Sequence, residues 1–352
     1  MPNLTRRKLM QGSTALAAAA LSTRVVSAAP AAEAITPALI EAAKKEGKVV
    51  WYTSVDLPLS EKVGKAFEAK YPGVSVRVER SGAERVFQRI GQEYGSRIHA
   101  VDVVNSSDAA HLIVWKRDGW LAPYVSEDIA KHYPAEHKDP DGQFASFRVT
   151  LSVIGYNTNL VKREEAPKSF ADLLDPKWAG KLMKAHPGYS GTILTATFQI
   201  ARDLGWEYFE KLAKQRVMQL QSAADPPKKL SLGERAVMAD GVEYLVLQQK
   251  EAGNPVEPVY ATEGTPLIIG PNAIFKNAPN PNAARLFQSF SFSPECQQLI
   301  IDTGGLHSAH ALTREKPGRK SLSEIKLMKD DAAAVEKMSE EIKARYQKIF
   351  RV

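Results

Sequence analysis

The chain has only one cysteine among its 352 residues. Cys296 therefore has no partner for an intramolecular disulfide, and metal sites built from several thiolates are excluded. The seven histidines show neither the i, i+4 spacing nor the His-x-Glu spacing of zinc sites. We expect Cys296 to be a small buried hydrophobic residue, and we expect no structural metal or cofactor.

Long apolar runs are also scarce. After residue 34, no segment approaches the 18 or so consecutive apolar residues that a membrane-spanning helix needs. Residues 5–10 read Thr-Arg-Arg-Lys-Leu-Met and precede a weakly apolar run at 11–23. This pattern indicates an export signal over residues 1–34. Its adjacent arginines are typical of twin-arginine signals, and an ordinary secretory signal is the alternative.

The predicted leader offers two cleavage sites, because small residues alternate at 26–28 and again at 32–34. Cleavage after Ala34 leaves 43 basic and 39 acidic side chains, so the net charge falls from +7 to +4. Both signs are interspersed along the chain. A nucleic-acid partner is therefore not expected, since it requires a concentrated Lys/Arg face.

Sequence motifs of catalysis are absent. The chain has no Gly-x-Ser-x-Gly elbow, no Gly-x-x-x-x-Gly-Lys-Ser/Thr loop and no Gly-x-Gly-x-x-Gly after a strand. We therefore expect a binding protein and no enzyme. A cleft enzyme stays as an alternative, because an α/β fold alone does not decide the function.

Strand-like and helix-like segments alternate through the first third of the chain. The expected strands are 48–52, 74–79 and 100–104, and the expected helices are 60–71 and 83–94. This order predicts a mostly parallel α/β sheet, which binds ligands at the carboxyl ends of its strands. The polar residues at those ends, expected to contact a ligand, are Thr53, Ser54, Ser106 and Ser107.

About 318 residues remain after the leader, which is more than one hydrophobic core usually holds. Strand-like runs at 148–157 and 260–269 are expected to cross between two lobes. The first lobe is predicted to hold residues 35–147 and about 265–315, and the second 148–264 and about 316–352. Helices are also expected at 228–239 and within 322–350.

Residues 186–192 read His-Pro-Gly-Tyr-Ser-Gly-Thr and precede a helix-like run. Ser190 or Thr192 can cap this helix, and together with Gly191 its first backbone amides form a plausible anion site. Ser190 as an N-cap without ligand contact is the alternative. Arg85 can pair with the anion or lie exposed on its helix.

Four segments in this order resemble the ferric-ion-binding branch of the periplasmic solute-binding proteins of ABC transporters. They are Val49-Val50-Trp51-Tyr52-Thr53-Ser54, Ala100-Val101-Asp102-Val103-Val104-Asn105-Ser106, Asp175-Pro176-Lys177-Trp178-Ala179-Gly180-Lys181 and Tyr189-Ser190-Gly191-Thr192. The resemblance implies a type II periplasmic-binding-protein fold, in which two lobes joined by crossing strands close over a ligand. It further implies a periplasmic protein that delivers its ligand to a membrane permease, and we expect the protein to be a monomer.

The resemblance leaves the ligand open, since that branch also includes binders of thiamine, phosphonates and phosphorylated sugars. Ferric members carry a Tyr-Tyr pair where this chain reads Glu243-Tyr244, so Asp56, Glu243 and Tyr244 form an alternative site for transported Fe3+. The hydroxyl-rich strand ends favour an organic phosphate, phosphonate or carboxylate, with Tyr244 as a contact. A sensory protein that presents its ligand to a receptor is a further alternative.

Overall fold

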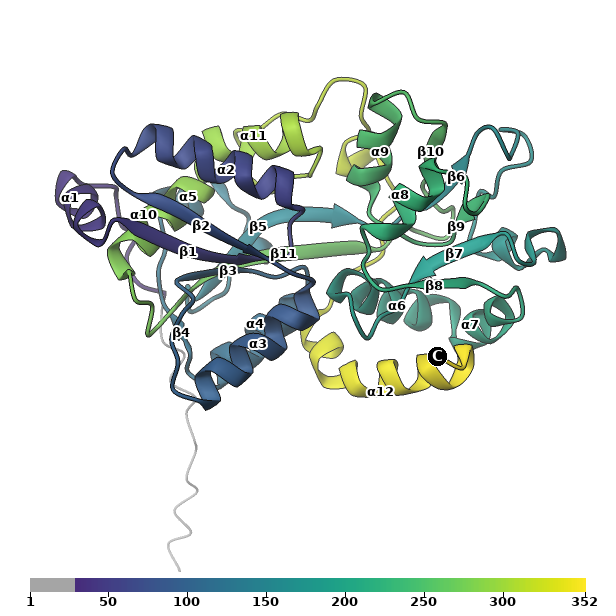
Figure 1. Ribbon diagram of the computed structural model, residues 1–352, viewed down its shortest axis with the longest axis horizontal. Helices are drawn as coiled ribbons and strands as arrows, with labels where there is room; N and C mark the ends of the chain where they lie inside the picture. The colour runs from purple at the N-terminus through teal and green to yellow at the C-terminus, as the bar shows by residue number, and fades with distance from the viewer. Residues whose placement is uncertain (1–28) are drawn as a thin grey trace, which may run out of the picture.

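Two β-sheets, each covered by helices, lie side by side in the computed structural model (Figure 1). The structure describes residues 29–352, so Arg6, Arg7 and most of the predicted export signal lie outside the described residues. The first sheet has the order β2 (Ser75–Arg80), β1 (Lys48–Thr53), β3 (Val103–Asn105), β11 (Leu267–Phe275), β4 (Leu121–Ala122), with β5 (Phe144–Leu151) also paired to β11.

The second sheet has the order β10 (Val256–Val259), β6 (Ile154–Asn157), β9 (Val237–Met238), β7 (Leu182–Ala185), β8 (Met218–Leu220). The predicted two-lobed α/β fold is thus confirmed. We call the half around the first sheet lobe 1 and the half around the second sheet lobe 2. The exact assignment of chain segments to the lobes stays a prediction.

Strands β5 and β11 join the lobes. They run antiparallel from Leu267 opposite Leu151 to Ala273 opposite Phe144, with a register shift between Gly270 and Pro271. Both strands extend from lobe 1 toward lobe 2 in Figure 1. Since their backbones are hydrogen-bonded to each other, the two lobes share a stiff two-stranded connection.

Helices cover both sheets. Those of lobe 1 are α1 (Pro37–Glu46), α2 (Leu57–Lys70), α3 (Ala83–Gly95), α4 (Ala109–Arg117), α5 (Glu127–His132), α10 (Pro281–Ser291) and α11 (Pro294–Gly304). Those of lobe 2 are α6 (Gly191–Leu204), α7 (Trp206–Ala213), α8 (Asp225–Ser231) and α9 (Glu243–Glu251). Short 3-10 helices are η2 (Ala135–His137), η3 (Ala171–Leu174), η4 (Pro176–Trp178) and η5 (Leu322–Glu324).

The predicted helix at 228–239 is wrong in its second half. Helix α8 ends at Ser231, and residues 237–238 form strand β9 instead. Gly233 has φ +73°, a left-handed conformation that ends a helix. The apolar residues that follow therefore continue as a buried strand.

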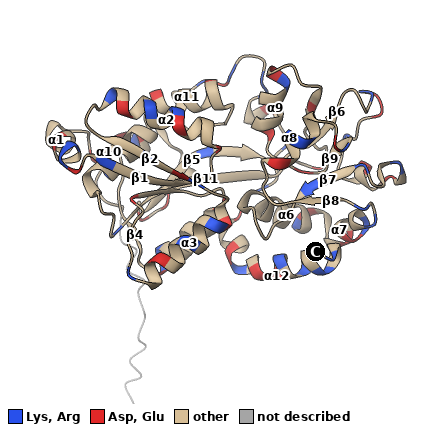
Figure 2. Cartoon of the chain, viewed as in Figure 1, with Lys and Arg blue, Asp and Glu red and all other residues tan. Residues whose placement is uncertain are grey.

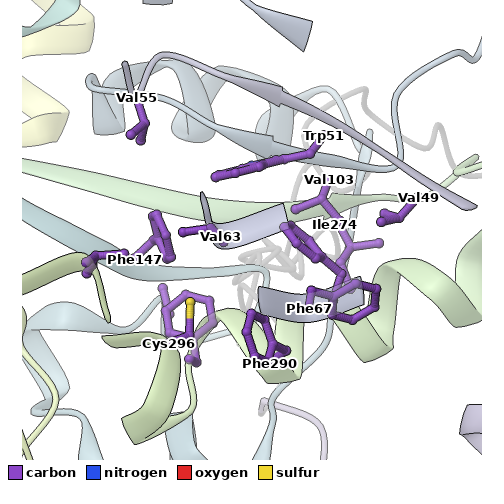
Figure 3. Close-up of a cluster of buried hydrophobic side chains, with 14 of the residues drawn as sticks. Val49, Trp51, Val55, Val63, Phe67, Val103, Phe147, Ile274, Phe290 and Cys296 are labelled. Carbon is purple, nitrogen blue, oxygen red and sulfur yellow. The ribbon is translucent and has the colours of Figure 1, made fainter. Parts of the chain in front are cut away.

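An aromatic core fills the space between the lobe 1 sheet and its helices (Figure 3). Trp51 meets Phe147 edge-on at 5.9 Å between ring centroids, and Phe67 meets Phe287 at 5.2 Å. Cys296 lies in this core and is fully buried, as predicted, and burial raises the pKa of its thiol. The cysteine is therefore a packing residue.

Charged residues of both signs alternate along the outer helices, including α2 and α3 (Figure 2). None of the helices among the described residues combines the length and the apolar character needed to cross a membrane.

The C-terminal helix α12 (Ala332–Phe350) packs on both lobes (Figure 1). In lobe 2 its Tyr346 is fully buried against α7. In lobe 1 its Lys343 forms a 2.9 Å ion pair with Glu84 of α3. The helix therefore connects the lobes at a second place, apart from the crossing strands.

Residues just before α1 belong to the folded lobe. The amide of Glu33 donates to the carbonyl of Val125 at 2.8 Å, and Glu33 forms a parallel bridge with Ser126. Ala29, Pro30 and Ala32 line a cavity with the side chains of α5 and its neighbouring loops. This segment lies between the two predicted cleavage sites.

We therefore predict cleavage after residue 28, so that the mature chain begins at Ala29. A chain that begins at Ile35 should lose a backbone hydrogen bond and the apolar contacts of Pro30 and Ala32, which together are worth about 1–2 kcal/mol. Its melting midpoint should fall by a few degrees relative to a chain that begins at Ala29. Mass spectrometry of the exported protein gives the terminus directly, and a terminus at Ile35 with equal midpoints would contradict the prediction.

Candidate functional site

A small cavity of about 30 Å³ lies where the two lobes meet. Residues from the ends of β1, β2 and β3, from the crossing strand β5 and from the first turns of α3, α6 and α9 surround it. The lining residues are Ser54, Arg80, Gly82, Ala83, Ser107, Arg148, Tyr189, Ser190, Thr192, Ser222, Ala223, Ala224, Val242 and Tyr244. We call this space the inner cavity.

The parallel pairing of β1 and β3 brings their polar ends together, with Thr53 opposite Asn105. Ser54 and Ser107, which follow these strands, line the inner cavity. Their neighbours have local roles instead. The hydroxyl of Thr53 accepts from the amide of Val55, and Ser106 bonds to His111 Nδ1 at 2.9 Å.

Arg148 is the charged group buried deepest at the inner cavity, with 2% of its surface exposed. Its guanidinium donates to Asn105 Oδ1 at 3.3 Å, Thr150 Oγ1 at 3.1 Å and Ser54 Oγ at 3.1 Å. All three acceptors are neutral, and no carboxylate of residues 29–352 forms an ion pair with it. Burial lowers the pKa of Arg148, but a guanidinium stays charged in proteins. The site therefore holds a buried positive charge that no carboxylate of residues 29–352 pairs directly, although the nearby Asp56 favours the charged form.

Arg80, at the end of β2, adds a second guanidinium. Its Nε donates to the carbonyl of Val55 at 3.3 Å, and within the described part of the chain it forms no ion pair with a carboxylate. Sequence analysis missed both arginines. A signal was present for Arg148, because an arginine between Phe147 and Val149 in a strand otherwise buried on both faces requires a polar partner.

The start of α6 faces the inner cavity. Ser190 is the N-cap, with its Oγ accepting from the amide of Ile193 at 3.4 Å, and Thr192 lies in the first turn. Ser190 thus caps the helix and lines the cavity at once. Helices α3 and α9 also begin at the cavity, at Gly82 and Val242, and neither has a side-chain cap. Their unpaired first amides strengthen the positive potential there.

Tyr244 lines the inner cavity from the first turn of α9, with 4% of its surface exposed. Burial and the nearby carboxylate of Asp56 raise the pKa of its phenol, so the hydroxyl keeps its proton at neutral pH. Tyr244 therefore presents a protonated hydroxyl at the inner cavity, next to the carboxylate of Asp56.

Glu243 belongs to a different cluster. Its Oε2 lies 2.9 Å from His307 Nε2 and 3.2 Å from Arg319 Nη2, and its Oε1 accepts from the hydroxyl of Tyr260. The structure thus brings Asp56 and Tyr244 together but holds Glu243 in a separate buried ion network. This network lies close to Arg148, because the backbone of His307 forms an antiparallel bridge with Val149, the residue after Arg148.

The Glu243 network predicts a pH-dependent stability. Burial opposes protonation of His307, but the carboxylates of Glu243 and Glu315 raise the pKa of His307 to about 9. A histidine pKa raised from its ordinary value near 6.5 adds stability that is complete below pH 6.5 and is lost as the pH rises toward 9. The loss should reach about 3 kcal/mol.

Chemical denaturation of the protein and of His307→Gln from pH 6 to 9.5 measures this term. The unfolding free energy of the unsubstituted protein should fall with pH relative to that of the variant. Parallel pH profiles for the two proteins would contradict the assigned role of His307.

A second polar cluster, of Glu84, Asp108 and His111, has metal-ligand types within 4.8 Å of one another. His111 Nε2 lies 3.0 Å from Glu84 Oε1, and Lys343 of α12 lies 2.9 Å from Glu84 Oε2. The two carboxylates raise the pKa of His111 although burial opposes it. Two cations thus balance two carboxylates, which favours an ion network between α12 and lobe 1 over a metal site.

Arg85 lies exposed on α3, outside the inner cavity. Its Nη2 donates to Gln221 Oε1 of lobe 2 at 2.9 Å. The two residues line an adjoining, larger cavity. The structure therefore separates Arg85 from Ser190 and Thr192, the other predicted anion contacts.

Gly191 lets the lobes approach closely. A Cβ atom at this position would lie 2.6 Å from the Cβ of Asp108 and 3.3 Å from that of Ala83, both in lobe 1. Such a 2.6 Å contact is sterically forbidden, so any larger residue must hold the lobes apart.

We predict that Gly191→Ala weakens ligand binding at least about 10-fold while the protein stays folded, because the added methyl group blocks closure. Gly91→Ala in α3 is the control, since a Cβ there meets nothing within 4 Å. Calorimetry gives the affinity and small-angle scattering the ligand-induced compaction. Equal affinity and equal compaction in the two variants would contradict the prediction.

The chain resembles known proteins in sequence and in structure. Residues 101–323 match the family described as bacterial extracellular solute-binding proteins. An uncharacterized protein of Haemophilus influenzae is 27% identical over 278 residues, 74% of this chain and 78% of that protein. Iron uptake protein A1 of Synechocystis sp. is 24% identical over 280 residues, 76% of each chain.

Two solved structures share the fold. The periplasmic binding protein AfuA of Actinobacillus pleuropneumoniae, with exogenous fructose-6-phosphate bound, superposes with a TM-score of 0.80 at 25% identity, covering 87% of this chain and 99% of AfuA. Iron-bound HitA of Pseudomonas aeruginosa gives a TM-score of 0.74 at 22% identity, covering 86% of this chain and 99% of HitA.

Proposed function

The chain belongs to the family of bacterial extracellular solute-binding proteins, in the branch that resembles ferric-ion-binding proteins, and we propose that it captures a small organic anion for an ABC importer. In this family the bound solute is transported cargo and no cofactor is carried. The proposed setting is the periplasm, which the chain reaches by its twin-arginine-like signal. There a monomer closes over its ligand and docks on a membrane permease.

The observation that carries this proposal is the buried guanidinium of Arg148. A buried charge without a counter-ion is costly, by several kcal/mol for an isolated ion. An anion in the inner cavity removes that cost and gains charge-assisted hydrogen bonds from Arg148 and Arg80. The first amides of α3, α6 and α9 and the hydroxyl of Tyr244 add further donors.

Ferric iron is the second candidate, favoured by the name of Iron uptake protein A1 and by iron-bound HitA. The side chains support it less well. Glu243 is already paired with His307 and Arg319, and Tyr244 has a raised pKa that opposes a phenolate ligand. Two guanidinium groups at the cavity repel a trivalent cation.

A cleft enzyme and a sensory protein remain the alternatives of other classes. Among the residues that line the inner cavity, no histidine or cysteine is present, so a nucleophile paired with a base is not favoured. A sensory protein would use the same site and the same closure, so the site does not distinguish the two functions. We propose the importer because one relative carries the name probable ABC transporter periplasmic-binding protein.

Thermal melting with ferric citrate, inorganic phosphate, phosphate esters, phosphonates and carboxylates tests the proposal, because a ligand that binds the folded state raises the melting midpoint.

Removal of a charge-assisted hydrogen bond costs about 1.5–3 kcal/mol, so Arg148→Gln and Arg80→Gln should each weaken anion binding about 10–100-fold. Tyr244→Phe with Ser190→Ala should also weaken it, by a smaller factor.

Arg77→Gln is the matched control, since Arg77 is an exposed arginine on the same strand as Arg80 and bonds to Glu79. Its anion affinity should equal that of the unsubstituted protein. A midpoint raised by iron alone, with no response to any anion, would establish the ferric candidate instead.

A further inference from the structure

A groove of about 470 Å³ lies on lobe 2, apart from the inner cavity. Strands β6 and β10, the loop at 158–170, the end of α9 and the segment before η5 line it. It shares no lining residue with the inner cavity, so the proposed cargo site does not use it. We call it the lobe 2 groove.

Positive charge dominates the lobe 2 groove. One carboxylate lines it, that of Glu257, together with four basic side chains, those of Arg163, Lys168, Lys250 and Lys320. Lys250 is paired, since its Nζ lies 2.7 Å from Glu257 Oε1. The other three basic side chains are exposed, and none of them forms an ion pair with a carboxylate of residues 29–352.

Acidic residues of the same loop do not line the groove. Glu164 and Glu165 follow Arg163 in the chain, but both are exposed outside the lining. The three cations without an ion pair therefore repel one another in the empty groove. An anionic partner relieves this repulsion and gains charge-assisted hydrogen bonds.

Two tyrosines add an aromatic surface to this charge. Tyr156 of β6 lies opposite Glu257 of β10 in the antiparallel register, with 5% of its surface exposed. Lys320 Nζ lies 5.2 Å from the centroid of the Tyr260 ring. Val259 lies between them on β10 and also lines the groove. Such a lining can pack against apolar side chains as well as pair with acidic ones.

Strand β10 forms one edge of the lobe 2 sheet, because it pairs with β6 alone (Figure 1). The consecutive residues 257–260 line the groove. An edge strand can pair its free backbone groups with an extended chain. Pro258 has no amide to donate, so backbone pairing stays partial and charge supplies much of the affinity.

A groove suits a narrow chain better than a flat surface. The cations come from the loop after β6, from α9 and from the segment before η5, so they surround a concavity. A lipid bilayer presents a flat layer of headgroups, and a single small anion reaches few of the cations. An extended peptide places a side chain about every 3.3 Å and can reach several of them.

We propose that the lobe 2 groove docks an acidic, extended segment of a partner protein. Carboxylates of the segment pair with Arg163, Lys168 and Lys320. Apolar side chains between the carboxylates pack on Tyr156 and Tyr260. This docking does not depend on which cargo the inner cavity holds.

Fluorescence anisotropy of a labelled hexaglutamate peptide with the mature protein tests the inference. The triple variant Arg163→Gln, Lys168→Gln, Lys320→Gln removes the three cations that lack an ion pair. Exposed ion pairs contribute about 3-fold each to an affinity, so this variant should bind the peptide at least about 10-fold more weakly. Tyr260 stays unchanged, because its hydroxyl bonds to Glu243.

The matched control is the triple variant Lys45→Gln, Lys62→Gln, Lys65→Gln. It makes the same change of charge at exposed lysines of α1 and α2 in lobe 1. It should bind hexaglutamate within about 2-fold of the unsubstituted protein, since distant exposed charges are screened by salt. Both triple variants should keep the melting midpoint of the unsubstituted protein, because exposed substitutions change stability little.

Two results would overturn the inference: no binding of hexaglutamate to the unsubstituted protein, or an equal loss of affinity in the two triple variants. Cosedimentation with phosphatidylglycerol vesicles tests a membrane as the occupant. If vesicle binding requires the three cations and peptide binding does not, the groove faces a lipid surface and the inference is wrong. None of these outcomes bears on anion binding at Arg148, so the proposed function is tested separately.

Discussion

The buried guanidinium of Arg148 is the feature on which the site depends. It sits on a crossing strand, between the lobes, and its three hydrogen-bond acceptors are all neutral. A folded protein tolerates such a charge because neutral acceptors and water compensate it in part, and an anion compensates it fully. We therefore expect the buried charge to lower the free energy of unfolding of the ligand-free protein, and a bound anion to raise it again.

Closure follows from the same arrangement. The proposed anion would lie between groups of both lobes, because Ser54 and Ser107 line the inner cavity on one side and Ser190 and Thr192 on the other. Gly191 permits the close approach, and α12 adds the Lys343–Glu84 ion pair across the lobes. The proposed site therefore couples ligand binding to lobe closure, since each set of donors is incomplete without the other.

Several of the residues that line the candidate site could be predicted from the sequence. The serines after β1 and β3 and the cap of α6 follow from local patterns, because strand ends and helix starts are signalled within a few residues. The role of Glu243 could not be predicted, since its partners His307 and Arg319 lie 64 and 76 residues away. Arg80 was missed because only the folded chain places it at the cavity without an ion pair. Arg148 was missed although its position in an apolar strand was a signal, because the sequence does not show that its hydrogen-bond partners are neutral.

The most direct measurement is an anomalous difference map from crystals of the protein grown with arsenate, a tetrahedral oxyanion that diffracts anomalously. The account predicts one strong peak in the inner cavity, within hydrogen-bonding distance of the Arg148 guanidinium and the start of α6. An inner cavity without a peak at saturating arsenate would contradict the assignment of this site to an anion.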